Sequence, residues 1–268
     1  MTVFHILLLS LIQGLTEFLP VSSSGHLVLL PHFFGWQNQG LEMDVALHVG
    51  TLTAVLIYFW ADVWRMVTHF FRYCLKGFRP QDLDDQVRLA LSLVVATLPA
   101  VFVGFILKKM GLDDIRQVSV IATTSIVFAF VLFACDRFGS RKNSLSEITL
   151  KRGFLIGLGQ ALALIPGVSR SGICISIALS LGFTRVAAAR FAFLMSIPSI
   201  IGAATLTTFD VIKEGTPLVW VDIGLAIVYS SLAGLLAIHF MLTFLARHSL
   251  TIFVVYRIIL GLSIWLVL

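Results

Sequence analysis

Charged residues are scarce in this chain: Asp, Glu, Lys and Arg together make up 12% of its 268 residues, whereas 58% are hydrophobic. Soluble globular domains carry about 25% charged residues, so the composition excludes that class. The mean hydropathy of +0.98 indicates an integral membrane protein instead. Long polar linkers and low-complexity tracts are also absent, and we therefore expect one membrane domain that covers residues 1–268.

Cysteine is rare as well, and several catalytic motifs are missing. The three cysteines, Cys74, Cys135 and Cys174, lie in or beside apolar segments without the spacing of metal ligands. We expect them to be unpaired thiols that pack as small hydrophobic side chains. The absence of GxxxxGK[ST] and of HExxH argues against ATP-driven chemistry and against a tight zinc site. The segment from Gly167 to Ser171 also misses the GxSxG turn of soluble hydrolases.

Apolar segments of about 20 residues, the length that crosses a bilayer, recur along the chain. They cover residues 43–60, 87–107, 117–135, 186–208, 219–243 and 250–268. Two further apolar segments, 3–35 and 153–180, are too long and too often interrupted by Pro, Gly and Ser to be single helices. The first lacks a basic start and an Ala-x-Ala site, so we expect mature structure rather than a signal peptide.

The loops between these spans predict the orientation in the membrane. Loops 61–86 and 136–152 hold many Lys and Arg residues and should face the cytoplasm, whereas loops 31–42 and 209–218 are almost free of them. The basic loop at 108–116 does not fit this scheme. We expect the net charge of +5 to meet the anionic lipids of the cytoplasmic leaflet rather than nucleic acid.

A serine-rich turn occurs once in each interrupted segment. The first copy runs from Gln13 to His26 and the second from Gln160 to Gly172, and an offset of 147 positions superposes Gln, Leu, Val, two Ser and Gly without a gap. Because three spans separate the copies, the second copy starts from the opposite face of the membrane, as in an inverted-topology repeat.

The fold class follows from this arrangement. Irregular backbone at membrane depth is tolerated only inside protein or beside a water-filled cavity. Each copy of the serine-rich turn should therefore form a re-entrant helix-turn-helix hairpin. We expect an all-α integral membrane protein with six transmembrane helices and two re-entrant hairpins whose tips meet near mid-membrane. The two repeats would cover about residues 1–135 and 148–268.

The copies differ in their ionisable residues. The first alone has Glu17 and His26, and the second has Arg170 where the first has Ser23. An ionisable residue in an apolar span costs about 2.5–3.5 kcal/mol and is therefore a candidate for function. Glu17 also lies one helical turn after Gln13, which places both on one face.

The turns are suited to an anion. Glycine permits backbone angles that bring N–H groups together, serine hydroxyls add donors, and a helix beginning after the turn directs its positive end to the same place. Arg170 would bind two phosphate oxygens with its planar guanidinium, or pair with Glu17 as a structural partner. The residues that we expect to bind phosphate are Gln13, Ser22, Ser24, Gly25, Ser169, Ser171 and Gly172.

These motifs resemble those of the undecaprenyl-diphosphatase family, also called bacitracin-resistance proteins. The likeness rests on Gln13-x-x-x-Glu17, on the Pro-Val-Ser-Ser-Ser-Gly-His segment that ends at His26, and on Pro166-Gly-Val-Ser-Arg-Ser-Gly172, and it extends along essentially the whole chain. It implies a bacterial enzyme that hydrolyses the C55 isoprenoid diphosphate to the monophosphate and phosphate, which recycles the lipid carrier of cell-wall synthesis and confers bacitracin resistance. It also implies the cytoplasmic (inner) membrane, with an active site that opens to the outer, periplasmic side.

The resemblance also implies roles for single residues. By position, Glu17, Ser23, His26 and Arg170 match the family's essential residues, and a divalent cation, Mg²⁺ or Ca²⁺, is expected, with Glu17 as its candidate ligand. Gln13 stands where many members have Glu, which removes one candidate ligand. The nucleophile stays open between Ser23 with His26 or Glu17 as its base, His26 itself, and an activated water.

One further departure and one charge remain without a role. Cys174 stands where the second motif usually ends in Thr, and Arg257 in the last apolar segment suits a carboxylate partner and a substrate contact equally well. The oligomeric state is also open, and a homodimer is one option.

Two other function classes share some of these features. Inverted repeats with meeting hairpins are also a transporter architecture, so a secondary transporter or flippase for an anionic lipid or a small anion is the main alternative. At the 147 offset, however, Glu17 and His26 face Leu164 and Ile173, and this asymmetry favours a one-sided catalytic site. A type-2 phosphatidate phosphatase is disfavoured because Ser176 occupies the place of its required histidine.

Overall fold

The computed structural model describes residues 2–36, 39–111, 117–214 and 219–267, and within these ranges it contains helices and no β-strand. The α-helices are α1 (Val3–Phe18), α2 (Ser23–Phe34), α3 (Leu41–Tyr58), α4 (Trp60–Leu75), α5 (Asp85–Met110), α6 (Val118–Phe138), α7 (Leu150–Leu162), α8 (Arg170–Ser180), α9 (Arg185–Glu214), α10 (Trp220–Leu245) and α11 (Thr251–Val267). Short 3-10 helices cover Pro80–Asp82 and Leu145–Glu147.

The predicted class, an all-α membrane protein, is confirmed. In the described ranges, α3, α5, α6, α9 and α10 are long and apolar enough to cross a membrane, and they coincide with five of the predicted spans. The sixth predicted span, 250–268, is the apolar helix α11, whose 17 residues lie at the lower end of the spanning range. Each interrupted segment forms a helix, a turn and a second helix, α1 with α2 and α7 with α8.

The prediction of a loop at 61–86 was wrong for most of that segment. Helix α4 begins at Trp60, directly after a break in the helical backbone at Phe59, and it packs against α5. We inferred a loop because the segment is charged, but its apolar and polar residues are spaced for the two faces of an amphipathic helix. Asp84 then caps α5 by accepting hydrogen bonds from the backbone of Gln86 and Val87, each at 2.9 Å.

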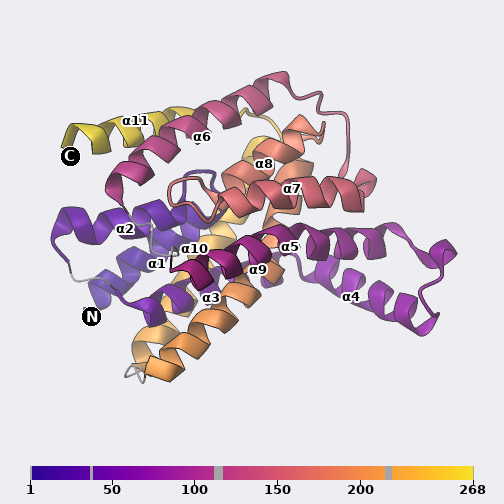
Figure 1. Cartoon of the computed structure of the whole chain (residues 1–268), viewed down its shortest axis with the longest axis horizontal. Coiled ribbons are helices and arrows are strands. Elements are labelled where there is room, and N and C mark those ends of the chain that lie inside the picture. Colours follow the sequence, from indigo (N-terminus) through magenta and orange to yellow (C-terminus); the bar gives the residue numbers. More distant parts are fainter. Residues whose placement is uncertain (1, 37–38, 112–116, 215–218, 268) are drawn as a thin grey trace.

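The two hairpins enter the molecule from opposite ends (Figure 1). The amino and carboxyl termini lie at one end, together with the open end of the α1–α2 hairpin. The connections from α4 to α5 and from α6 to α7 lie at the other end, and the α7–α8 hairpin enters from there. Entry from opposite faces of a membrane stays a prediction.

Each hairpin packs on a long helix from the other half of the chain. Helix α1 lies along α10, and α7 lies along α5. Both contacts need glycine: a Cβ at Gly14 would collide with Ala233 and the backbone of Ser230, and one at Gly157 would collide with the backbone of Ala96. Small residues that let helix backbones approach closely are the usual basis of helix association in membranes.

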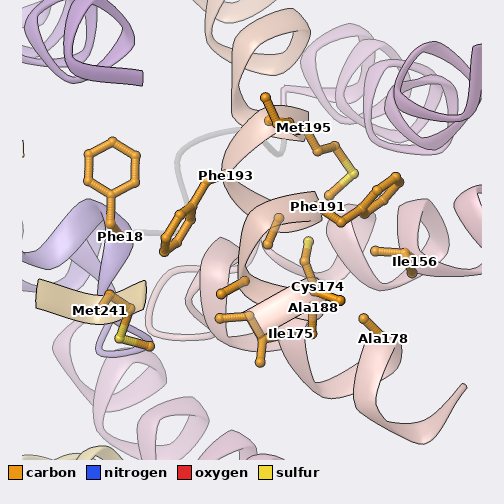
Figure 2. Close-up of a cluster of buried hydrophobic side chains, with 14 of the residues drawn as sticks. Phe18, Ile156, Cys174, Ile175, Ala178, Ala188, Phe191, Phe193, Met195 and Met241 are labelled. Carbon is orange, nitrogen blue, oxygen red and sulfur yellow. The ribbon is translucent and has the colours of Figure 1, made fainter. Parts of the chain in front are cut away.

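The apolar core brings Phe18 of the first hairpin and Cys174 of the second together with residues of α9 (Figure 2). Phe18 at the end of α1 meets Phe193 of α9 edge to face, with ring centroids 5.3 Å apart. Cys174 of α8 is fully buried in the same core and, like Cys74 and Cys135, is unpaired, as predicted. The thiol at position 174 therefore packs as an apolar group.

Candidate active site

The two serine turns have the same local geometry. Ser22 and Ser169 precede α2 and α8, and both adopt a positive φ, 73° and 71° respectively. Each hydroxyl caps its helix by accepting from a glycine N–H, Gly25 at 3.3 Å and Gly172 at 3.1 Å. An L-residue in this conformation is strained by about 1–2 kcal/mol, and the cap offsets this cost.

The serine two positions further on completes each turn. The hydroxyl of Ser24 lies 3.4 Å from that of Ser22, and the hydroxyl of Ser171 lies 3.3 Å from that of Ser169. The hydroxyls of Ser22 and Ser169 are thus engaged as helix caps. Their binding of phosphate stays a prediction, as does that of exposed Ser24.

Direct hydrogen bonds join the two hairpin tips. Ser171 donates its hydroxyl proton to the carbonyl oxygen of Leu19 at 2.9 Å. Arg257 of α11, only 1% exposed, donates to the carbonyl oxygens of Pro20 at 3.3 Å and Gly167 at 2.8 Å. It also donates to the α6 carbonyl of Ser125 at 3.2 Å. Among the described contacts of Arg257 the partners are backbone carbonyls and not a carboxylate, so this cation connects both tips to α6.

Four of the predicted site residues converge where the tips meet. Glu17 is 7% exposed, and its Oε1 accepts from Arg170 Nη2 at 2.8 Å. Its Oε2 accepts from Ser23 Oγ at 2.5 Å and from Gln13 Nε2 at 3.1 Å. Arg170 also donates through Nη1 to the carbonyl oxygen of Ala192 in α9 at 2.8 Å. The guanidinium is thus held between a carboxylate and a backbone carbonyl.

His26 lies one helical turn from Ser23 but faces a different partner. Its Nδ1 is 2.7 Å from the carbonyl oxygen of Ser22, and its Nε2 is 2.6 Å from the hydroxyl of Tyr256 in α11. A carbonyl only accepts, so Nδ1 carries the proton and Nε2 accepts from the tyrosine. None of the described contacts joins His26 to Ser23 or to Glu17.

Sequence reasoning missed two residues near this site. Tyr256 directly precedes Arg257 in the last apolar segment, and nothing in the local pattern connects it to a histidine 230 positions away. His48 of α3 lies within electrostatic range of Glu17, and its Nδ1 is held by the carbonyl oxygen of Asp44 at 2.7 Å. The position of His48 four residues after Asp44, within a predicted span, was the available signal.

The described residues offer a metal ion few ligands. They contain no group of three or more His, Cys, Asp or Glu side chains that could hold a metal ion. Gln13 Oε1 is buried beside Glu17 without a hydrogen-bond partner, so two oxygen-bearing side chains are adjacent. Mg²⁺ and Ca²⁺ take at least six oxygen ligands, and most of these would have to come from phosphate or water.

Taken together, the cluster can bind an anion and transfer a proton. The first helical residues of α2 and α8 are Ser23 and Arg170, so both helix N-termini are directed at the place where the charged side chains meet. A serine hydroxyl donates to a carboxylate there, which is the arrangement of a nucleophile with an adjacent base. The guanidinium supplies a permanent positive charge.

Comparison with known proteins gives the family. The chain matches the family described as "Bacitracin resistance protein BacA" over residues 6–263. It is 48% identical over 264 residues to a protein of Roseobacter denitrificans, covering 98% of this chain and 97% of the relative. It is 45% identical over 267 residues to one of Alcanivorax borkumensis (98% of each chain) and 43% identical over 268 residues to one of Alteromonas mediterranea (100% and 99%). All three relatives are named undecaprenyl-diphosphatase. The chain therefore belongs to the bacitracin resistance protein BacA family.

Proposed function

We propose that this protein is a membrane phosphatase that hydrolyses undecaprenyl diphosphate to undecaprenyl phosphate and inorganic phosphate. The family match and the names of its relatives support this activity. The observation that carries it is the convergence of Ser23, Glu17 and Arg170 at the meeting point of two helix N-termini. Release of the monophosphate returns the lipid carrier to cell-wall synthesis and confers resistance to bacitracin.

The substrate would bind with its two chemically different parts in different surroundings. The diphosphate would occupy the junction of the hairpin tips, beside Arg170 and the N-termini of α2 and α8. The isoprenoid chain would remain in the bilayer between helices, because exposing it to water would cost about 0.8 kcal/mol of transfer free energy per CH₂ group.

In the first step, Ser23 Oγ attacks the terminal phosphorus. Its proton passes to Glu17 Oε2, which already accepts it at 2.5 Å, and the bond from that phosphorus to the bridging oxygen breaks. Undecaprenyl phosphate leaves and phosphoserine remains. Arg170 turns from Glu17 to the phosphoryl oxygens, which stabilises the charge in transit and leaves the carboxylate free to take the proton.

In the second step, water attacks the phosphorus of phosphoserine. Ser23 Oγ departs and takes back the proton from Glu17, while His26 Nε2 accepts the proton of the water. His26 has no described contact with Ser23, and this favours a role with water rather than with the serine. Of the three nucleophiles that the sequence left open, the hydroxyl bonded to Glu17 is therefore the best supported.

Glu17 and Gln13 Oε1 would hold a divalent cation, and its other oxygen ligands would have to come from phosphate or water. When bound, it neutralises phosphate charge. The chain's own cation, Arg170, does not depend on it.

The proposed setting is the bacterial cytoplasmic membrane, with the site open to the periplasm. The basic ends of α4 and α6 support a cytoplasmic position for the connections that follow them, and the opposed hairpins of Figure 1 support an inverted repeat. Residues Leu164 and Ile173, at the positions equivalent to Glu17 and His26, are apolar, and a symmetric transport site has no support from them.

The test is phosphate release from undecaprenyl diphosphate by the purified protein in detergent. With substrate labelled at the terminal phosphate, rapid acid quench should trap label on the peptide that contains Ser23. Ser23→Ala should release no phosphate above background, whereas Ser180→Ala, at the exposed end of α8, should match the parent. A parent protein without phosphatase activity would overturn the function, and label on His26 or on no residue would overturn the serine route.

A further inference from the structure

The last helix supplies the residue that faces His26. Tyr256 Oη lies 2.6 Å from His26 Nε2, and the two rings are nearly parallel, with an interplanar angle of 9° and centroids 5.8 Å apart. Because the carbonyl of Ser22 holds the proton on Nδ1, Nε2 presents a lone pair, and the phenol must be the donor. Both nitrogens of His26 are therefore assigned by their partners.

The position of Tyr256 is set by its neighbour in the chain. Arg257 is buried and bonded to the carbonyls of both hairpin tips, so the register of α11 against the α2 hairpin is fixed one residue away. Helix α11 also packs closely on α6, since a Cβ at Gly261 would lie 2.8 Å from the carbonyl oxygen of Ala122. The phenol thus reaches His26 from a rigid support, while Tyr256 as a whole is 43% exposed at the edge of the site.

We infer that Tyr256 is a positioning residue for His26: its hydroxyl donates to Nε2, which fixes the orientation of the imidazole and holds Nε2 at the edge of the site until a water replaces the phenol. This inference rests on the proposed function, because it assigns His26 the role of accepting the proton of that water. Partners of this kind fix the tautomer and orientation of a functional histidine without touching the substrate. Tyr256 is accordingly not a catalytic residue.

Tyr256→Phe tests this inference because it keeps the ring and its stacking and removes only the hydroxyl. Loss of one hydrogen bond to the imidazole should lower kcat about 3- to 10-fold with KM within about 2-fold of the parent. Diethyl pyrocarbonate should modify His26 about 3- to 10-fold faster, because Nε2 has lost its partner. Tyr229→Phe is the matched control, since Tyr229 is a similarly exposed tyrosine of α10. It should change neither kcat nor the rate at which His26 is modified.

A double-mutant cycle separates positioning from a general effect on folding. In a His26→Ala background, Tyr256→Phe should not lower kcat further, because the residue acts only through the imidazole. The inference is overturned by an unchanged rate of His26 modification, by a change in KM alone, or by equal losses of kcat in both backgrounds. The modification rate can be measured in a protein without phosphatase activity, so failure of the proposed function is distinguishable from failure of this inference.

Discussion

Arg257 offers the sharpest test of how the two hairpins are held together. Its guanidinium is fully buried and donates to a carbonyl oxygen of each tip. Replacement by Met keeps most of the volume but removes every donor. The carbonyl oxygens of Pro20 and Gly167 would then be buried without partners. Arg257 also donates to the carbonyl oxygens of Thr124 and Ser125, but these lie within α6 and can accept hydrogen bonds from the helix backbone.

The magnitude follows from those two carbonyls. A buried acceptor left without a partner costs about 1–3 kcal/mol, and relief from burying a charged side chain offsets part of the sum. We expect Arg257→Met to lower the free energy of unfolding by about 2–4 kcal/mol, which corresponds to roughly 5–10 °C in the apparent Tm of a chain of this size. Activity should fall more steeply, by about 100-fold, because a displacement of about 1 Å between Ser23 and Arg170 is enough for that loss.

Thermal unfolding in detergent, followed by tryptophan fluorescence, measures the first effect, and phosphate release measures the second. Arg247→Met is the matched control, because Arg247 is an exposed arginine just after α10 and should leave both values unchanged. Arg257→Lys should be intermediate, since one ammonium group cannot reach both tips as the planar guanidinium does. An Arg257→Met protein with the parent's Tm and turnover would refute the idea that this residue joins the hairpins.

Two further predictions concern the neighbours of Glu17. Gln13→Glu replaces an amide that donates to Glu17 Oε2 at 3.1 Å with a second carboxylate. Phosphate release by this variant should be at least 10-fold more sensitive to chelation of divalent cations than in the parent. Equal sensitivity in both proteins would contradict this prediction. Arg170→Lys keeps the charge, but one ammonium group cannot bond Glu17 and the carbonyl of Ala192 as the planar guanidinium does. The kcat should fall by about 100- to 1,000-fold in a folded protein. Near-normal turnover would show that Arg170 does not stabilise the charge of the phosphoryl group.

Local patterns predicted the helical hairpins and much of the site. Clusters of Pro, Gly and Ser interrupt two apolar segments, and the turns between α1 and α2 and between α7 and α8 lie at these clusters. The offset between the copies then brought Glu17 and Arg170 to one place, and the structure joins them at 2.8 Å. The prediction of a loop at 61–86 was wrong because charged residues do not exclude an amphipathic helix, and Met66 is buried on the apolar face of α4.

The contacts that the sequence could not predict involve partners without a local signature. The carbonyls of Pro20 and Gly167 bind Arg257, but every residue has a carbonyl, so no residue type marks such an acceptor. The pairing of His26 with Tyr256 depends on how α11 packs beside α2, and that register follows from tertiary contacts alone.

The proposed repeat would account for the meeting of the proposed nucleophile, Ser23, and the cation of Arg170 at one carboxylate. Ser23 and Arg170 are equivalent at the 147 offset, and each is the first residue of its helix, directly after a serine cap with a positive φ. The two turns touch at their tips, so residues at equivalent positions of the turns lie near the same contact. Ser23 Oγ and Arg170 Nη2 accordingly both bond Glu17, at 2.5 and 2.8 Å. Two identical residues at these positions would offer either two hydroxyls or two repelling cations, so the difference between the copies is what places a hydroxyl, the proposed nucleophile, beside a permanent cation.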